Sequence, residues 1–426
     1  MKYYTVLAII GAGIGGSSCA YFLRTLFGKQ LLIDIFEKAL PGGRTVTAKV
    51  GTCMYEAGGS VIHQQNLYMT QFRSLLSLDA VIHPSSNVKF AIVDGAELRY
   101  VHSTKPILRF LKPLWRYGLG LWRVDRHVRQ MVQGLSHIYR LQDRGLAFTS
   151  VRNLLHGADP GLILEATGSL QSHLSLLGCR KRLVYELGQG ITRLNYGQDV
   201  EIHGLVGLVA FAGMQPGLWS VKGGNHLVSS GLISKTRAHL RNSEVISVTR
   251  SSGGGYAVYS TSSSGAEKQV DVYDAGNLAV PADLSEKHRD FQYLLNCNSH
   301  DFYNSIGKVL PVSGKDPESQ TVYKVFSGQP LSVDCLKSLF SRIDGIESRE
   351  FLAYPCYAGT AVFPTFRIAP GLYHINAIEA AASCMEMIAI GARNVALLAY
   401  NEILNKNDSI DATVSKIRTK QETYGC

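Results

Sequence analysis

The sequence has no uninterrupted apolar run near the roughly 18 residues that a membrane-crossing helix requires, so it predicts no membrane span. Its eight cysteines are widely spaced and form no Cys-x-x-Cys pair, which argues against a zinc site and a dithiol redox motif. We therefore expect no metal, while the cysteine pattern leaves disulfides undecided. The apolar N-terminal stretch runs into a glycine loop without a small-residue cleavage site, so it predicts a buried strand and no visible signal peptide.

Acidic residues are fewer than basic ones, 33 against 43, and the formal net charge is +10. An excess of positive charge can favour binding to nucleic acid, to an anionic membrane or to acidic substrates. The basic residues are scattered, however, and the densest group lies at residues 116–129, close to Trp115 and Trp122, in the pattern of an amphipathic helix. We expect no nucleic-acid partner and leave peripheral association with a membrane open. Nothing in the sequence indicates an obligate protein partner.

Charged residues make up only 18% of the 426-residue chain and hydrophobic residues 46%, which suits a globular protein with a sizeable core. A chain of this length exceeds what one core normally organises, so we expect two interleaved domains.

A glycine motif near the N-terminus indicates a dinucleotide site. Gly11, Gly13 and Gly16 follow an apolar segment (residues 4–10) and open a helical pattern (residues 17–27), and a second strand pattern (residues 31–36) leads to Glu37. An acid about 20 residues after the last glycine can accept hydrogen bonds from the ribose, and the helix N-terminus favours the pyrophosphate charge. The pattern predicts a βαβ unit that binds a dinucleotide.

The segments after Glu37 favour FAD over NAD. Pro41-Gly42-Gly43-Arg44 follows directly, and Glu56-Ala57-Gly58-Gly59-Ser60 comes a short loop later. Both are similar to the glycine-glycine-arginine and acid-x-glycine elements of the flavin amine oxidase superfamily, in which the arginine reaches the pyrophosphate and the second glycine pair passes beside the flavin ring. A planar guanidinium suits that role because it can grip phosphate oxygens at two points. For Glu56 a helix-capping carboxylate remains nearly as good an interpretation.

The C-terminal part supplies the last predicted element of the cofactor site. Asn376 and Glu379 lie in a loop between a short strand pattern (residues 371–375) and a long, alanine-rich helical pattern (residues 377–404), and the superfamily closes its FAD site in this way. The complete set of predicted FAD-binding residues is Gly11, Gly13, Gly16, Glu37, Lys38, Gly43, Arg44, Gly58, Gly59, Ser60, Val245, Asn376 and Glu379.

The middle of the chain divides into a helical and a strand-rich part. Helical patterns dominate residues 81–226, including 113–144 and 162–188, and this block looks inserted into the nucleotide-binding domain. Segments 244–248, 256–261 and 269–273 alternate around Ser/Gly-rich turns and predict a β-meander, and a strand at 274–280 is expected to end at Pro281.

These patterns predict an α/β protein with an FAD/NAD(P)-binding Rossmann-like fold and an interleaved substrate domain that adds α+β elements. The expected divisions are residues 1–80, 227–284 and 366–405 for the FAD-binding domain, 81–226 and 285–365 for the substrate domain, and 406–426 for a C-terminal tail.

Further segments resemble one family along almost the whole chain. They are residues 11–17 (Gly-Ala-Gly-Ile-Gly-Gly-Ser), 59–63 (Gly-Ser-Val-Ile-His), 194–198 (Leu-Asn-Tyr-Gly-Gln), 216–219 (Pro-Gly-Leu-Trp), 223–225 (Gly-Gly-Asn), 304–307 (Asn-Ser-Ile-Gly), 353–355 (Ala-Tyr-Pro) and 382–387 (Ala-Ser-Cys-Met-Glu-Met). In order and content they resemble the prenylcysteine oxidase (prenylcysteine lyase) family.

The resemblance implies an FAD-dependent thioether oxidase. Its substrate would be farnesyl- or geranylgeranylcysteine, cleaved with molecular oxygen and water to cysteine, a prenyl aldehyde and hydrogen peroxide during degradation of prenylated proteins. The flavin would carry the redox chemistry, and the protein would position the substrate and exclude bulk water. The family also implies a lysosomal location, with a cytoplasmic one as the alternative.

Few residues are candidates for a catalytic role beside the flavin ring. The resemblance makes His63 the candidate catalytic group, because the segment after Gly59 runs beside the flavin, although a lone histidine is more often structural. Tyr196 and Tyr354 are candidate pocket walls and are equally compatible with core packing.

Two other functions remain as alternatives. One is a flavin amine or polyene oxidase with a different substrate domain. The other is a prenyl-binding carrier similar to the GDP-dissociation inhibitors of small GTPases, which share the fold and lack FAD. The glycines, Glu37 and Arg44 disfavour such a carrier.

Overall fold

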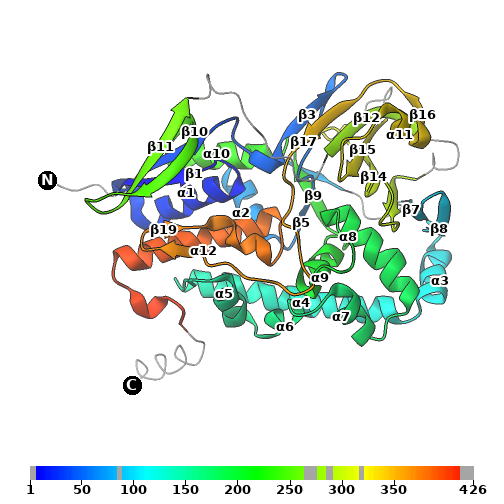
Figure 1. The fold of residues 1–426 in the computed structure, drawn as a ribbon, viewed down its shortest axis with the longest axis horizontal. Helices are drawn as coiled ribbons and strands as arrows, with labels where there is room; N and C mark the ends of the chain where they lie inside the picture. Colours follow the sequence, from blue (N-terminus) through cyan, green and yellow to red (C-terminus); the bar gives the residue numbers. More distant parts are fainter. Residues whose placement is uncertain (1–5, 84–88, 263–275, 285–290, 316–320, 413–426) are drawn as a thin grey trace.

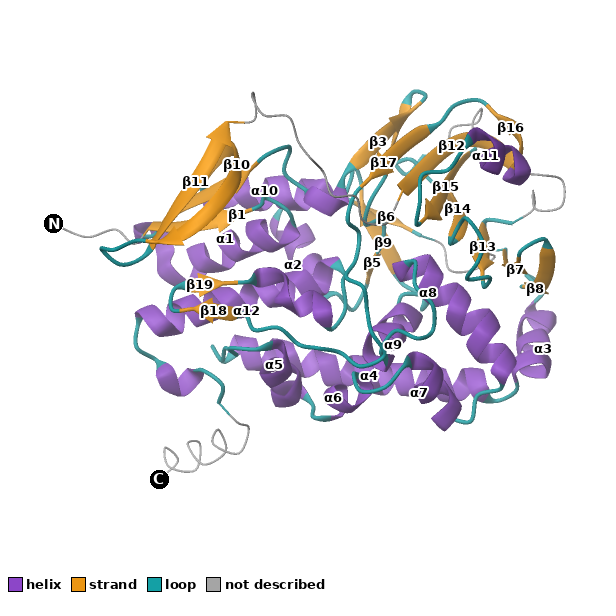
Figure 2. Cartoon of the chain, in the orientation of Figure 1, coloured by secondary structure: helices purple, strands orange, loops and turns teal. Residues whose placement is uncertain are grey.

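The computed structural model describes residues 6–83, 89–262, 276–284, 291–315 and 321–412. A four-stranded sheet with its helices lies at one end of the molecule, a larger sheet at the other, and a layer of helices runs along both (Figure 1). Figure 2 shows most of the strands in two separate groups above that helical layer. The predicted third meander strand, residues 269–273, lies outside the described residues, as do residues 413–426 of the predicted tail.

The small sheet contains the predicted nucleotide-binding unit. Its strand order is β1 (Val6–Ile10), β2 (Leu32–Glu37), β10 (His239–Arg250) and β11 (Tyr256–Ser262). The first three strands are parallel, and β10 and β11 form an antiparallel hairpin. α1 (Ile14–Phe27) connects β1 to β2, which confirms the predicted βαβ unit, and it packs between α10 (His226–Thr236) and α12 (Met385–Ile403).

The larger sheet has eight strands. They are β16 (Phe340–Ile343), β12 (Gly276–Leu284), β15 (Val322–Ser327), β14 (Ser305–Val309), β13 (Tyr293–Asn296), β7 (Phe90–Asp94) and β8 (Glu97–Val101) in spatial order, with β17 (Glu347–Glu350) also paired to β12. α11 (Val333–Leu339) lies beside it (Figure 1).

The prediction that a strand ends at Pro281 is wrong. β12 continues to Leu284, and Pro281 is the last residue that pairs with β15, after which Ala282 pairs with β16. A proline cannot donate a ladder hydrogen bond, and here it lies at the end of the ladder with β15, where the strand changes partner. β12 also joins residues 276–284 to the larger sheet, although the sequence placed them in the FAD-binding domain. The predicted domain boundaries otherwise stay a prediction.

The helical layer forms most of the predicted helical block, residues 81–226, but β7 and β8 of the larger sheet also lie within that block. The members of the layer are α3 (Pro106–Tyr117), α4 (Gly120–Asp143), α5 (Val151–Ala158), α6 (Gly161–Glu165), α7 (Leu170–Leu176), a π-helix (Leu183–Gly188), α8 (Gln189–Tyr196) and α9 (Gly204–Ala212). The helix predicted over residues 113–144 is two helices. Gly118 has φ +67°, a conformation that favours glycine, and it ends α3 before α4 begins.

The long C-terminal helix begins later than predicted. Residues 375–380 form a 3₁₀ turn, and α12 starts at Met385, where the Cys384 Sγ accepts the Met387 N–H (3.5 Å). The turn is held in place by Glu379, which forms an ion pair with Arg44. A long-range contact therefore overrides the helix propensity of the alanines.

Smaller elements complete the chain. They are β3 (Thr47–Val50) with β4 (Cys53–Glu56), β5 (Ile62–His63) with β9 (Leu218–Val221) and β6 (Ala80–Ile82), β18 (Arg367–Ala369) with β19 (Leu372–Tyr373), α2 (Leu67–Leu75), and short 3₁₀ turns at 28–30, 43–45 and 407–409. Among the described residues, none of the helices is both long enough and apolar enough to span a bilayer.

Buried side chains form two main cores. The larger one joins α1 and α12 of the nucleotide-binding region to α4, α5 and α9 of the helical layer. The smaller one lies on one face of the eight-stranded sheet and is covered by α11.

Candidate functional site: a cavity from the glycine turn to the helical layer

One cavity of about 2340 Å³ brings together nearly all of the predicted cofactor residues. Every one of them lines it except Glu379. Residues from α4, α8, α9, β13 and β15 line the same space, so the cavity continues from the nucleotide-binding region into the helical layer and the larger sheet.

The glycine turn has the shape that a bound pyrophosphate needs. Gly11 has φ +94° and donates its N–H to the Phe36 carbonyl (2.8 Å). A Cβ on Gly16 would overlap the Gly11 carbonyl oxygen, so this glycine allows the helix and strand to pack. A Cβ on Gly13 would meet no atom closer than 3.8 Å, and Gly13 lines the cavity. The absence of a side chain at Gly13 thus leaves room for a ligand and is not required by packing.

The Glu37 carboxylate lies at the end of β2 beside this turn. Its Oε2 accepts the Ala12 N–H (2.8 Å) and its Oε1 accepts the Ala39 N–H (2.9 Å). Each oxygen keeps a further lone pair for a ribose hydroxyl. Next to it, Lys38 pairs with Glu244 of β10 (3.3 Å). The arrangement fits the adenosine end of FAD, and ribose binding by Glu37 stays a prediction.

Arg44 reaches the cavity but is also anchored away from it. Its guanidinium forms the ion pair with Glu379 and donates to the Ala353 carbonyl (2.8 Å). Glu379 is buried and does not line the cavity, and its carboxylate orients Arg44, so its predicted role in binding the cofactor stays a prediction. Asn376 does line the cavity.

Two buried ionisable groups lie near Gly58 and Gly59: Glu56, which the sequence analysis considered without assigning it to the cofactor site, and Lys324, which it did not single out. The Lys324 ammonium donates to the Gly58 carbonyl (2.8 Å) and to Ser60 Oγ (2.9 Å). Burial lowers the pKa of Lys324 to about 8, and burial raises the pKa of Glu56 to about 8. Both line the cavity. A lysine inside the apolar strand segment Val-Tyr-Lys-Val-Phe was the available sequence signal.

Asn225 fixes the loop that carries these groups. Its N–H donates to Glu56 Oε1 (2.6 Å) and its side-chain amide to the Gly59 carbonyl (2.9 Å). The Gly223-Gly224-Asn225 segment therefore supports the flavin-side glycine pair from behind.

Comparisons with known proteins agree with this geometry. The prenylcysteine lyase family model matches residues 100–295 and 283–412, and an NAD(P)-binding Rossmann-like domain model matches residues 9–75. The chain belongs to the prenylcysteine lyase family. It is 36% identical to prenylcysteine oxidase 1 of Bos taurus, covering 98% of this chain and 92% of the relative. It is 30% identical to the human prenylcysteine oxidase 1-like protein, covering 97% and 94%.

Similarity to solved structures shows the fold of this chain but not its substrate. A putrescine oxidase double mutant aligns with a TM-score of 0.59 at 13% identity, covering 94% of this chain and 99% of that chain. Cyclohexylamine oxidase from Brevibacterium oxydans aligns with a TM-score of 0.58 at 16% identity, with the same coverage. The predicted α/β class with a Rossmann-like domain is confirmed. As a member of the prenylcysteine lyase family, the protein is an FAD-dependent oxidoreductase.

In this member of the family, the two ring nitrogens of His63 are both engaged by main-chain groups, so His63 is not free to act as a base. The His63 Nδ1 accepts the Gln65 N–H (3.2 Å), and its Nε2 faces the Pro216 carbonyl (3.1 Å), so the proton is on Nε2. Burial lowers its pKa, which keeps the ring neutral. His63 lines the cavity, yet both nitrogens bind main chain, and its predicted catalytic role stays a prediction that this geometry disfavours.

The predicted wall tyrosines do lie in the cavity of this prenylcysteine lyase family member. Tyr196 and Tyr354 line it and contact each other edge to face, with ring centres 5.2 Å apart. Tyr357 contacts Tyr196 in the same way at 5.4 Å.

Proposed function

We propose that the protein oxidises the thioether of farnesyl- or geranylgeranylcysteine, producing cysteine, a prenyl aldehyde and hydrogen peroxide from oxygen and water. The observation that carries the proposal is the continuity of the cavity, which joins the glycine turn to a part lined by apolar side chains. These include Phe90, Val132, Leu135, Leu194, Val209, Ala212, Met214 and Leu295. A prenyl chain buried there gains about 0.8 kcal/mol per CH₂.

The residues of this chain would hold FAD and position the substrate. Gly13, Glu37 and Arg44 would hold the dinucleotide, and Lys324, Ser60 and Gly59 lie along the side predicted for the ring. Bound FAD supplies the hydride acceptor and its reoxidation by oxygen supplies the peroxide. Hydride loss from the prenyl carbon bonded to sulfur leaves a cation shared with the sulfur and the alkene. Water adds to it and the carbon–sulfur bond then breaks, so the chain needs no strong base.

Anaerobic mixing with farnesylcysteine tests this function. The flavin absorbance should bleach, and admission of air should give farnesal, free cysteine and peroxide. S-methylcysteine has the same sulfur and lacks the apolar tail, so it should reduce the flavin far more slowly. Faster bleaching by putrescine or another amine than by farnesylcysteine would support the amine oxidase alternative. A colourless protein that cannot be reconstituted with FAD would support the carrier alternative, which the open space at Gly13 disfavours.

The proposal includes a membrane surface formed by α3. Ile107, Phe110 and Trp115 are 73%, 74% and 80% exposed on this helix. The helix is attached to the body at its C-terminal end, through buried Tyr117 and through the two hydrogen bonds of Arg116 to Glu186 (2.7 Å each). Ile107, Phe110 and Trp115 are therefore left exposed to solvent.

Charge favours an anionic bilayer as the occupant of this surface. Between residues 98 and 124 the sequence has no acidic residue and six Lys or Arg residues. Arg99 and Arg116 form ion pairs with acidic residues outside this stretch, so the charge for a bilayer comes from Lys105, Arg109 and Lys112 on or beside α3. Apolar and basic side chains on one helix are typical of interfacial docking. Arg109 also lines the cavity, so a substrate dissolved in lipid would enter near the docked helix. Lysosomal membranes are the location that the family implies.

Vesicle co-sedimentation tests the surface. The protein should bind phosphatidylcholine vesicles that contain phosphatidylserine, and added salt should weaken binding. The double variant Phe110→Ser/Trp115→Ser should lose it, whereas Leu176→Ser, which changes an equally exposed leucine on α7, should not. Equal binding by both variants would contradict the proposal.

A further inference from the structure

The wall that carries Tyr354 has no secondary structure of its own. Within the described chain, residues 351–364 form neither helix nor strand, yet Ala353 and Tyr354 line the cavity. The position of this segment must therefore come from contacts with other parts of the chain, including contacts to its backbone.

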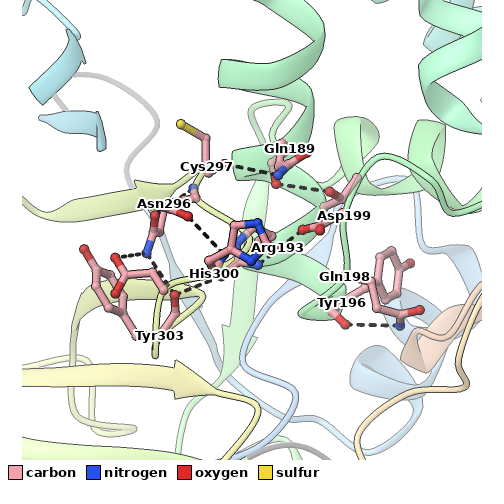
Figure 3. Close-up of polar contacts among 12 residues, drawn as sticks. Gln189, Arg193, Tyr196, Gln198, Asp199, Asn296, Cys297, His300 and Tyr303 are labelled. Atoms are coloured by element: carbon pink, nitrogen blue, oxygen red, sulfur yellow. Dashed lines mark hydrogen bonds and ion pairs between the residues drawn. The ribbon is translucent and has the colours of Figure 1, made fainter. Parts of the chain in front are cut away.

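Gln198 supplies two of those contacts at once. Its Nε2 donates to the Pro355 carbonyl (3.0 Å), and its Oε1 accepts the Tyr357 N–H (2.8 Å). The amide thus binds both polar groups on one side of the segment, in the way that a neighbouring strand would. The Nε2 also donates to the Tyr196 carbonyl (3.2 Å), as Figure 3 shows.

Gln198 is itself held in a fixed turn. It follows Gly197, which ends α8 with φ +61°, and a Cβ at Gly197 would lie 3.0 Å from Asn304 Nδ2. On the other side, buried Arg193 pairs with Asp199 (3.2 Å) and donates to the Tyr303 carbonyl (3.0 Å) (Figure 3). The turn is therefore connected to both α8 and the larger sheet.

The far side of the same segment is held by the cofactor residues. Arg44 donates to the Ala353 carbonyl (2.8 Å), and the Tyr357 hydroxyl donates to the Glu379 carbonyl (3.0 Å). Arg44 anchors one end and Gln198 anchors the middle and the other end. Between these anchors Tyr354 contacts Tyr196 across the cavity wall.

We infer that Gln198 is a positioning residue that holds residues 353–357 so that Tyr354 and Tyr196 form one wall of the prenyl site. The inference rests on the proposed function and adds a specificity determinant to it. Gln198 does not line the cavity, so its effect on substrate passes through the segment that it binds.

The test uses the FAD-bound enzyme and the variant Gln198→Met, which keeps the volume and removes all three hydrogen bonds of the amide, to Pro355, Tyr357 and Tyr196. The matched control is Gln171→Met on α7, a glutamine away from the cavity. Gln198→Met should keep its FAD and raise the KM for farnesylcysteine about tenfold with a smaller change in kcat, since the lost contacts support binding. Gln198→Glu keeps the acceptor for Tyr357 and should lie between wild type and Gln198→Met.

Hydrogen exchange separates this inference from the proposed function. The peptide containing the Tyr357 amide should exchange faster in Gln198→Met than in wild type, while peptides from α1 and α4 stay unchanged. Unchanged exchange of that peptide, an unchanged KM, or loss of FAD from the variant would each overturn the positioning role. If farnesylcysteine does not bleach the wild-type flavin, the proposed function and the role of this wall in prenyl binding both fail, whereas faster exchange of the Tyr357 peptide in Gln198→Met would still show that Gln198 holds the segment.

Discussion

At the scale of single residues, two glycines of the same motif should respond to substitution in opposite ways. Gly13→Val places its side chain in open cavity space, so the apoprotein should keep its thermal midpoint while FAD is lost on gel filtration. Gly16→Ala places a methyl group on the Gly11 carbonyl oxygen and should lower the midpoint of the apoprotein itself. Absorbance at the flavin band and thermal unfolding measure the two effects. Full FAD retention by Gly13→Val would place the pyrophosphate elsewhere.

Glu56 gives a pH prediction with a definite sign. Burial raises its folded-state pKa to about 8, so between its ordinary pKa of 4.5 and about 8 the folded state keeps a proton that the unfolded state releases. The free energy of unfolding should therefore fall as pH rises through that window. Glu56→Gln removes the titrating carboxyl group, so between pH 5 and pH 8 its free energy of unfolding should fall less than that of the wild type. The difference between the two proteins should be a few kcal/mol at most.

Urea unfolding at several pH values measures this difference. Lys324 faces the same region, and its pKa is lowered to about 8 in the folded state. Its titration therefore makes the free energy of unfolding rise with pH, but only above pH 8, outside the window for Glu56. Burial also raises the pKa of Glu386 to about 7, and that contribution is shared by both proteins. Parallel pH profiles for wild type and Glu56→Gln would show that Glu56 titrates normally.

At the scale of elements, one carboxylate connects three helices. Glu386 of α12 accepts the Tyr68 and Met69 N–H groups in the first turn of α2 (2.8 and 3.0 Å) and the Tyr139 hydroxyl of α4 (2.8 Å). Glu386→Ala leaves these donors buried without an acceptor and should cost at least about 2 kcal/mol of unfolding free energy. Tyr139→Phe removes one donor and should cost less, and the exposed Glu201→Ala serves as control. Equal denaturant midpoints for the three variants would contradict the prediction.

Elements differed in how far the sequence could predict them. The βαβ unit depends on local signals, namely apolar strands, a glycine turn and Glu37. These signals were sufficient to predict the unit and the residues that line the cavity beside it. The break between α3 and α4, the start of α12 and the path of β12 depend on Gly118, on the Arg44–Glu379 pair and on a change of strand partner. Two of these causes join residues far apart in the sequence, so no local pattern contains them. Gln198 is hidden for the same reason, since it binds the backbone of a distant loop. Lys324 has a local signal, its place inside an apolar strand segment, but its partner is also the backbone of a distant loop.

At the scale of the whole molecule, the two cores divide the chain differently from the predicted domains. The larger core joins α1 and α12 to α4 and α5, which the sequence placed in the substrate domain. The strands of the larger sheet face two ways: Ala91 and Val93 point into the small core beside α11, whereas Ile92 between them belongs to the large core. The helical layer should therefore unfold with the nucleotide-binding region, and the larger sheet should open more readily.

Native-state hydrogen exchange in low denaturant tests this division. Among the side chains that the structure describes, the smaller core contains ten buried ones, far fewer than the larger core, so it should open at a lower free energy. Amides of β14 and β15 should therefore exchange through an opening that costs less than the opening of α1, and amides of α4 and α5 should join α1 in one cooperative unit. Bound FAD should raise both opening free energies, because the cavity takes residues from both regions. If α4 instead exchanges together with β15, the predicted division into an FAD-binding domain and a substrate domain describes the cooperative units better than the buried cores do.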